Sequence, residues 1–190
     1  IWRSDEKIIS IDASWRFKVV AFATADGFLH VGSIRNGSEV TKYDLKTFAF
    51  NESDQNQVRN IKITRNFGFI VVSLLDRFLI FSVNGDFIKQ SKLISLLPST
   101  LNKQNQTNEE LPPKVTEKVI RLFPLNKRGI DFIAYQNDIF EIKIFEAFYP
   151  DKIQKICFAG CPVLCVEYDP ATNGYLIVRE SGRISLISSC

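Results

Sequence analysis

The stretch from Ile61 to Ile88, IKITRNFGFIVVSLLDRFLIFSVNGDFI, predicts three strands and the start of a fourth in one antiparallel sheet. It opens with alternating apolar residues, continues with a nearly unbroken apolar run from Phe67 to Leu75, and has a second run from Arg77 to Val83. Apolar runs of this length fit strands that are buried on both faces. The Asn84-Gly85 pair that follows is a strong hairpin signal, since both central residues of such a turn accept positive φ.

Copies of this stretch recur along the chain, which predicts a repeat architecture. A shift of 50 residues aligns Val19 to Ala23 with Phe69 to Ser73, and a shift of 106 residues aligns Tyr175 to Val178 with Phe69 to Val72. One more copy is predicted from Ile130 to Ile144, with a turn at Gln136 to Asp138 and a strand that starts at Ile139. Each copy is about four short strands, and a sheet buried on both faces stacks between two similar sheets.

The fold class predicted from this repeat is all-β, a β-propeller of the WD-repeat type. The sequence predicts four blades, over residues 8–45, 58–93, 118–158 and 163–190. The last blade has no fourth strand before Cys190, so the chain from 1 to 190 is expected to be an arc of a seven-bladed ring whose other blades lie upstream. An uncovered end blade would expose an apolar face that a soluble monomer rarely tolerates.

An insertion at 95–117 separates the second and third blades. It contains three prolines and the polar tract NKQNQTNEE, and it has too little apolar content to offset the entropy cost of ordering. We therefore predict a mobile surface loop there, with a short helical turn at most from Ser91 to Leu97.

Composition excludes several classes of function. The chain carries 24 basic and 21 acidic residues, a net charge of +3, without a basic cluster that could track phosphates, so no nucleic-acid partner is expected. No apolar run reaches the roughly 18 residues of a membrane span, and the N-terminus has no signal pattern, so a soluble chain without direct membrane insertion is expected. Three sequons, at Asn36, Asn51 and Asn105, leave open a secreted binding propeller.

No residue is predicted to be catalytic, to bind a cofactor or to bind a metal. His30, the only histidine, falls within a strand and is interpreted as a half-buried strand residue. Cys157, Cys161 and Cys165 recur every four residues, but Gly160 and Pro162 exclude a helix, and zinc and cluster motifs use two-residue spacers. We interpret them as small buried apolar residues rather than ligands.

The sixteen phenylalanines are the best candidates for an interaction surface. Those in predicted strands are expected to pack between blades: Phe22, Phe69, Phe78, Phe81, Phe132 and Phe140. Those nearer connections are candidates for contact with a partner: Phe48, Phe50, Phe145 and Phe148.

Several segments resemble the C-terminal WD-repeat region of BEACH-domain proteins of the neurobeachin and lysosomal-trafficking-regulator type. They are TRNFGFIVVS, LIFSVNGDFIK, IFEAFYPDKIQKI and VLCVEYDPATNGYLIVRESGRISLI. The resemblance covers nearly all of Ile61 to Cys190, and Ile8 to Leu45 agrees with it as one further blade. The most specific pieces are Gly68 to Val71, Asn84-Gly85 and Gly182 to Ile184. No repeat carries the Trp-Asp or Gly-His pairs of regular WD repeats.

The resemblance implies a large cytoplasmic scaffold in which PH-like and BEACH domains precede this propeller. Such a scaffold acts in vesicle trafficking, in lysosome-related compartments or in autophagy, and associates peripherally with endomembranes. The propeller would then bind other proteins, with no catalysis, cofactor or small-molecule ligand of its own.

An enzyme built on a propeller is the competing hypothesis. Its site would lie in the central channel and would collect carboxylates, His or Arg from the innermost strands of several blades. Because we expect the innermost strands to be almost purely apolar or hydroxylic, the sequence favours the non-catalytic scaffold.

Overall fold

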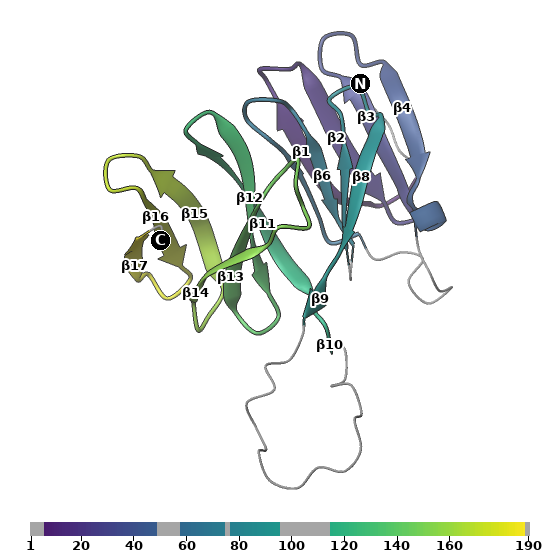
Figure 1. Ribbon diagram of the computed structural model, residues 1–190. Helices are drawn as coiled ribbons and strands as arrows, with labels where there is room; N and C mark the ends of the chain where they lie inside the picture. Colours follow the sequence, from purple (N-terminus) through teal and green to yellow (C-terminus); the bar gives the residue numbers. More distant parts are fainter. Residues whose placement is uncertain (1–5, 49–57, 75–76, 96–114, 189–190) are drawn as a thin grey trace, which may run out of the picture.

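A computed structural model describes residues 6–48, 58–74, 77–95 and 115–188 of the chain. In this part of the chain the fold is all-β apart from one short 3-10 turn, η1 (Leu45–Phe48). Four antiparallel sheets follow one another along the chain and stand side by side in an arc (Figure 1). In each sheet the spatial order of the strands is their order in the chain, which is the meander of a propeller blade.

The first three sheets have four strands each. Those of the first sheet are β1 (Ile8–Ser14), β2 (Val19–Thr24), β3 (Phe28–Ser33) and β4 (Glu39–Asp44). Those of the second are β5 (Asn60–Ile63), β6 (Ile70–Ser73), β7 (Arg77–Phe81) and β8 (Phe87–Lys92). Those of the third are β11 (Val119–Lys127), β12 (Ile130–Asn137), β13 (Glu141–Glu146) and β14 (Gln154–Phe158). The last sheet has three described strands, β15 (Val163–Asp169), β16 (Gly174–Arg179) and β17 (Ile184–Ser188).

The second sheet is buried on both faces, as its apolar runs predict. Alternate residues of β6 point to opposite sides: Ile70 and Val72 belong to the apolar cluster shared with the first sheet, and Val71 to the cluster shared with the third. On β7, Leu79 faces the first sheet and Phe78 the third. A comparable apolar cluster fills the space between the third and fourth sheets. The core is therefore three layers between blades rather than one centre.

Side chains connect the first strands of successive sheets, β1, β5, β11 and β15, which lie next to one another. The backbone N–H groups of Ile61 and Ile63 on β5 donate to Ser10 Oγ (2.9 Å) and Asp12 Oδ2 (2.8 Å) on β1. Arg121 Nη1 on β11 donates to the Val163 carbonyl on β15 at 2.8 Å. Polar side chains of the neighbouring blade thus satisfy edge backbone groups that a lone sheet would leave unpaired.

The turn at Asn84-Gly85 is of a different type from the one predicted. Gly85 has φ of +88°, but Asn84 has no positive φ. The Ser82 carbonyl accepts from Gly85 N–H (2.9 Å), and Ser82 N–H donates to the Asp86 carbonyl (2.8 Å). This is a three-residue loop with one left-handed residue, which needs a glycine at one position only.

In the third sheet the predicted strand start at Ile139 is wrong. β12 continues to Asn137, and Ile139 and Phe140 lie in the turn, where Phe140 has φ of +61°. The strand starts later because the Asn137 side chain accepts a hydrogen bond from Glu141 N–H at 2.7 Å and closes the turn.

The insertion predicted at 95–117 lies outside the described residues from 96 to 114. Its ends pair as a two-stranded ribbon, β9 (Ile94–Ser95) with β10 (Val115–Thr116). The helical turn expected from Ser91 is wrong in the described part, because this backbone pairs as β8 and β9 instead. Among the described residues, no helix has the length and apolar character that crossing a membrane requires.

Candidate functional site

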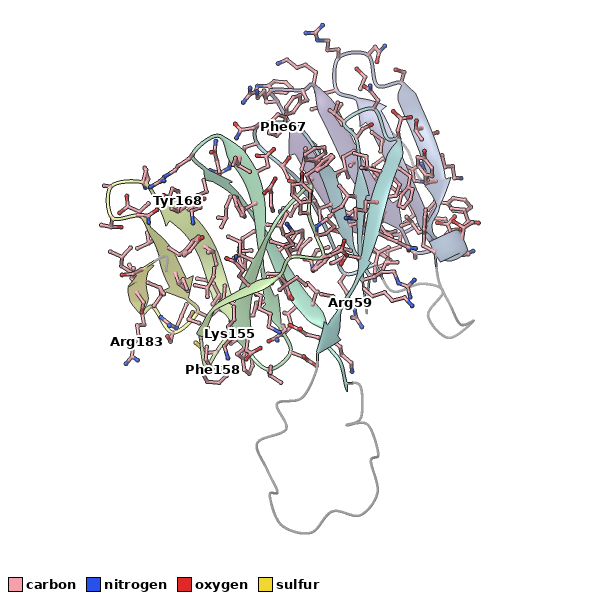
Figure 2. All side chains as sticks on the ribbon, in the orientation of Figure 1. Arg59, Phe67, Lys155, Phe158, Tyr168 and Arg183 are labelled. Atoms are coloured by element: carbon pink, nitrogen blue, oxygen red, sulfur yellow. The ribbon has the colours of Figure 1, made fainter. Side chains whose placement is uncertain are left out.

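A groove of about 360 Å³ lies between the second and third sheets. Its walls come from the turn between β5 and β6, from the start of β12, and from the end of β13 with the turn after it. Its lining is mostly aromatic and aliphatic: Phe67, Phe69, Ile130, Asp131, Glu146, Phe148 and Tyr149. We call it the interblade groove, and Phe67 marks its place at the upper edge of the arc in Figure 2.

Asp131, the second residue of β12, connects the two walls of the interblade groove. Its side chain is 1% exposed, and its carboxylate accepts hydrogen bonds from Asn66 N–H (2.9 Å) and Phe67 N–H (2.7 Å) of the second sheet. Asn126 Nδ2, also on the third sheet, donates to Asn66 Oδ1 at 3.1 Å. The turn that presents Phe67 is therefore fixed to the neighbouring blade.

Gly68 gives this turn its shape. It has φ of +73°, a backbone conformation that favours glycine. A Cβ atom there would also lie only 2.8 Å from Cδ2 of Phe17, so a larger residue would overlap the Phe17 ring. Immediately after it, Phe69 N–H donates to Thr64 Oγ1 at 2.9 Å. The two aromatic residues on either side of Gly68 are thereby separated: Phe67 is exposed and Phe69 is half-buried.

The aromatic rings form a continuous series across the two sheets. The Phe67 and Phe69 ring centroids are 5.9 Å apart, Phe69 and Phe148 are 6.1 Å apart, and Phe148 and Tyr149 are 5.2 Å apart. These spacings are within the range of favourable aromatic pairs. Phe67, Phe148 and Tyr149 remain 59%, 50% and 44% exposed, so the series is open to solvent.

The two charged residues of the lining are both acidic. The Asp131 carboxylate is occupied by backbone N–H groups, whereas the half-buried Glu146 side chain has no ion pair or hydrogen bond with the described residues. Lys152 Nζ lies 5.2 Å from the Tyr149 ring centroid. The groove thus offers apolar surface beside one unpaired carboxylate.

Of the four phenylalanines proposed to contact a partner, Phe148 is the one in this groove. Phe145 is fully buried among apolar residues, because it points to the second sheet. Phe48 is half-buried, with its ring 4.8 Å from that of Phe87. Phe50 lies outside the described residues.

The prediction that the strand phenylalanines pack between blades is correct for Phe69, Phe78, Phe81 and Phe132, which belong to or pack against the interblade clusters. It is wrong for Phe140, which lies in a turn, and for Phe22, which stacks on His30 and belongs to none of these clusters. Sequence reasoning missed five groove residues, namely Phe67, Ile130, Asp131, Glu146 and Tyr149. For Phe67, Ile130 and Tyr149 the available signal was their position beside predicted turns, since these three are exposed at sheet ends.

The innermost strands are more polar than predicted. β1 carries Asp12, β5 carries Lys62, β11 carries Arg121 and β15 carries Glu167. Inward-facing positions of these short strands border a second, polar cavity of about 340 Å³ between β5, β11 and β15, and charged groups can be hydrated there. The expectation of almost purely apolar or hydroxylic inner strands is therefore wrong, because Lys62, Arg121 and Glu167 on these strands line this polar cavity.

These inner charges are paired with one another or with the backbone. Arg65 Nη2 lies 2.8 Å from Glu167 Oε1, and Lys62 Nζ lies 3.8 Å from Asp12 Oδ1. Arg121 bonds both the Val163 carbonyl and Glu180 (2.7 Å). They hold blades together, and Glu167 is the one carboxylate among the described residues that line this cavity.

His30 is half-buried on β3, as predicted. Its ring stacks on Phe22 at 4.7 Å, and its Nδ1 lies 2.6 Å from Glu39 Oε1.

Of the three sequons, the one at Asn36 lies within the β3–β4 turn, where Asn36 Oδ1 accepts a hydrogen bond from Ser38 N–H (3.1 Å). The other two, at Asn51 and Asn105, lie outside the described residues.

The three described cysteines are free and half-buried rather than fully buried. Cys157 lies on β14 and Cys165 on β15, with Cys161 in the connection. Burial raises the pKa of the Cys157 and Cys165 thiols. No cluster of three or more His, Cys, Asp or Glu residues suited to a metal ion occurs among the described residues.

Comparison with known proteins supports the fold. No protein-family model matches the chain, and no curated protein sequence matches it. Among solved structures, the WD40 domain of SCAP from fission yeast superposes with a TM-score of 0.62 at 13% identity, over 98% of this chain and 40% of that one. The β-propeller domain of Cps50 (Swd1) from Myceliophteria thermophila superposes with 0.58 at 12% identity, over 97% of this chain and 52% of that one.

The computationally designed protein Ika4 gives a TM-score of 0.59 at 12% identity, over 98% of this chain and 94% of the designed chain. The fold is thus that of a WD40-type β-propeller. The chain spans about half or less of the natural propeller chains that it matches, and therefore forms part of a propeller.

Proposed function

We propose that the chain is the protein-interaction part of a BEACH-type scaffold that acts in vesicle trafficking, in lysosome-related compartments or in autophagy. Two lines support this. WD40 propellers generally serve as platforms for other proteins, and the segments around Gly68 to Val71 and Gly182 to Ile184 resemble the WD-repeat region of BEACH proteins. In this role the protein is cytoplasmic and reaches endomembranes through its other domains.

The interblade groove is the observation that carries the interaction role. Soluble proteins rarely leave contiguous aromatic surface in water unless it contacts something else. Here Phe67, Phe148 and Tyr149 are exposed together around a hollow whose shape is fixed by the buried Asp131. Binding at such a site requires no turnover.

The proposal that this chain is part of a BEACH-type protein can be tested directly. We expect the reading frame upstream of Ile1 to encode PH-like and BEACH domains followed by further blades. We also expect the separately expressed PH–BEACH pair to co-purify with the propeller that contains these four blades. An upstream frame without a BEACH domain would contradict the trafficking role and leave only the interaction role.

A further inference from the structure

We infer that the interblade groove binds a short apolar segment of another protein in which bulky apolar residues stand beside a Lys or Arg. The inference rests on the proposed interaction role and names the chemistry of the partner. Four features of the groove support it: its apolar lining, its fixed walls, the unpaired Glu146 carboxylate and the negative charge of its lining.

The lining sets the apolar part of the partner. Five of its seven residues are aromatic or aliphatic, and about 360 Å³ is within the usual volume of a binding pocket, roughly 300 to 1,000 Å³. The exposed rings of Phe67, Phe148 and Tyr149 surround it from two sheets. Burying them against apolar side chains would supply the free energy of binding.

The walls are fixed before any partner arrives. The Phe67 turn is held by the Asp131 carboxylate, and the Phe69 backbone by Thr64 Oγ1. A preformed site loses little conformational entropy on binding, which favours recognition of a short segment.

Glu146 sets the charge of the partner. It is half-buried at the end of β13, and it has no charged or hydrogen-bonding partner among the described residues. An apolar segment that covered it without supplying a cation would remove water from an unpaired charge, which is costly. A Lys or Arg beside the apolar residues would instead form a charge-assisted hydrogen bond with it.

The same charge argues against a lipid surface as the occupant. Cytoplasmic membrane leaflets are negatively charged and attract basic segments. The groove presents Glu146 and Asp131, and its rings line a hollow rather than a protruding edge. A basic apolar peptide is therefore the better match.

The test uses the full-length protein and a fluorescein-labelled peptide of sequence GLFKLFKG. A second peptide has Glu in place of both Lys, and a third has Ser in place of each Leu and Phe. We expect the basic apolar peptide to bind at least about tenfold more tightly than the acidic one, which corresponds to one favourable charge contact. The Ser peptide should show no saturable binding.

Variants of the protein assign the binding to this groove. Phe148→Ala should weaken binding of the basic peptide by about tenfold or more, as truncation of an aromatic anchor does. Phe158→Ala is the matched control, because Phe158 is 62% exposed and lies at the lower edge of the arc in Figure 2. Glu146→Lys should reverse the preference and select the acidic peptide, a change that misfolding cannot produce.

Three results would overturn the inference: equal affinity for basic and acidic peptides, no change with Phe148→Ala, or no reversal with Glu146→Lys. Binding to phosphatidylcholine–phosphatidylserine vesicles that disappears with Phe148→Ala would also overturn it, in favour of a membrane surface. Co-purification with the PH–BEACH pair is independent of these peptides, so its failure is separable and would count against the proposed function instead.

Discussion

Gly68 is the residue on which the interblade groove most depends. An alanine there would adopt φ of +73° and place its Cβ 2.8 Å from the Phe17 ring. Left-handed backbone costs roughly 1–2 kcal/mol for a residue other than glycine, and the overlap with Phe17 adds to that. We predict that Gly68→Ala lowers the free energy of unfolding by about 2–4 kcal/mol, measured by urea denaturation.

Gly182→Ala is the matched control for this variant. Gly182 has φ of +80°, but no atom lies within 4 Å of the added Cβ. It should therefore show the conformational cost alone, about 1–2 kcal/mol. Equal losses for the two variants would mean that the Phe17 ring moves aside and that the packing around Gly68 is loose.

A second prediction concerns Asp131, whose carboxylate holds the Phe67 turn. Asp131→Ala would leave the partly buried Asn66 and Phe67 N–H groups without their acceptor, which costs about 1–3 kcal/mol. We expect this loss of stability together with weaker binding of apolar peptides, because the Phe67 turn is released. Unchanged stability on thermal denaturation would show that the Asp131 bonds do not hold the turn.

The sequence could not have pointed to Asp131. Its partners are 64 and 65 residues away, and a lone Asp after Gly129-Ile130 looks like a solvent-exposed strand start. Gly68 belongs to a segment that resembles BEACH-type proteins, but Phe17, the residue that a Cβ at this position would overlap, lies in the preceding blade. Contacts between blades depend on how the repeats stack, which local patterns do not encode.

At the scale of the element, single polar side chains connect one blade to the next. Gln136 on β12 is fully buried; its Nε2 donates to the Cys161 carbonyl at 2.8 Å, and its Oε1 accepts from Val163 N–H at 3.0 Å. Gln136→Leu keeps the size but leaves both backbone groups unpaired, so we predict a loss of about 2–4 kcal/mol in the free energy of unfolding. Gln90→Leu, at an exposed position of β8, should change it little, and a similar loss in both variants would contradict this role for Gln136.

A charged network on β13 predicts how stability depends on pH. Burial alone would raise the pKa of Glu141, but hydrogen bonds from Lys155 and Lys143 and their positive charges lower it below its ordinary value of 4.5. A carboxylate whose pKa is lowered by folding stabilises the folded protein, and this contribution is complete at pH values above the pKa of the unfolded state. The contribution is lost as the pH falls from there through the lowered pKa of the folded state.

We therefore predict that stability falls more steeply between about pH 5 and about pH 3 in the natural protein than in Glu141→Gln, in urea titrations at each pH. Parallel curves would mean that Glu141 has the same pKa in the folded and unfolded states.

The elements themselves were largely predictable, because apolar runs and turn residues repeat. The doubly buried β6 and β7 follow directly from the unbroken runs around Ile70 and Phe78. What failed was turn detail: the Asn137 side chain shifted the start of β13 from Ile139 to Glu141, and Asn84 needed no positive φ. Such details depend on side-chain hydrogen bonds that a hydrophobic pattern does not contain.

At the scale of the whole molecule, the last sheet exposes an aliphatic face. On the last sheet, Leu176 pairs with Leu186 and Val178 with Ile184, on the face opposite the core. Leu176, Ile184 and Leu186 are between 38% and 63% exposed, and no described side chain covers them. This aliphatic face has the character of the faces that pack between the other blades, so we expect another sheet to pack against it in the whole propeller.

The outward face of the first sheet is partly covered by its own polar groups. His30 stacks on Phe22, and Lys42 Nζ lies 4.1 Å from the Phe28 ring centroid. Ile11, which pairs with Phe22, is nevertheless 56% exposed, so this end sheet also keeps an aliphatic side chain in solvent.

Sedimentation velocity of the 190-residue chain alone tests whether the exposed aliphatic face of the last sheet needs another sheet to cover it, as it would in part of a larger propeller. We predict concentration-dependent self-association through the aliphatic face of the last sheet. Leu176→Lys together with Leu186→Lys should abolish it, while Trp15→Lys, at a residue 70% exposed outside this face, should not. A stable monomer at all concentrations, with the same sedimentation coefficient in all three proteins, would contradict the account.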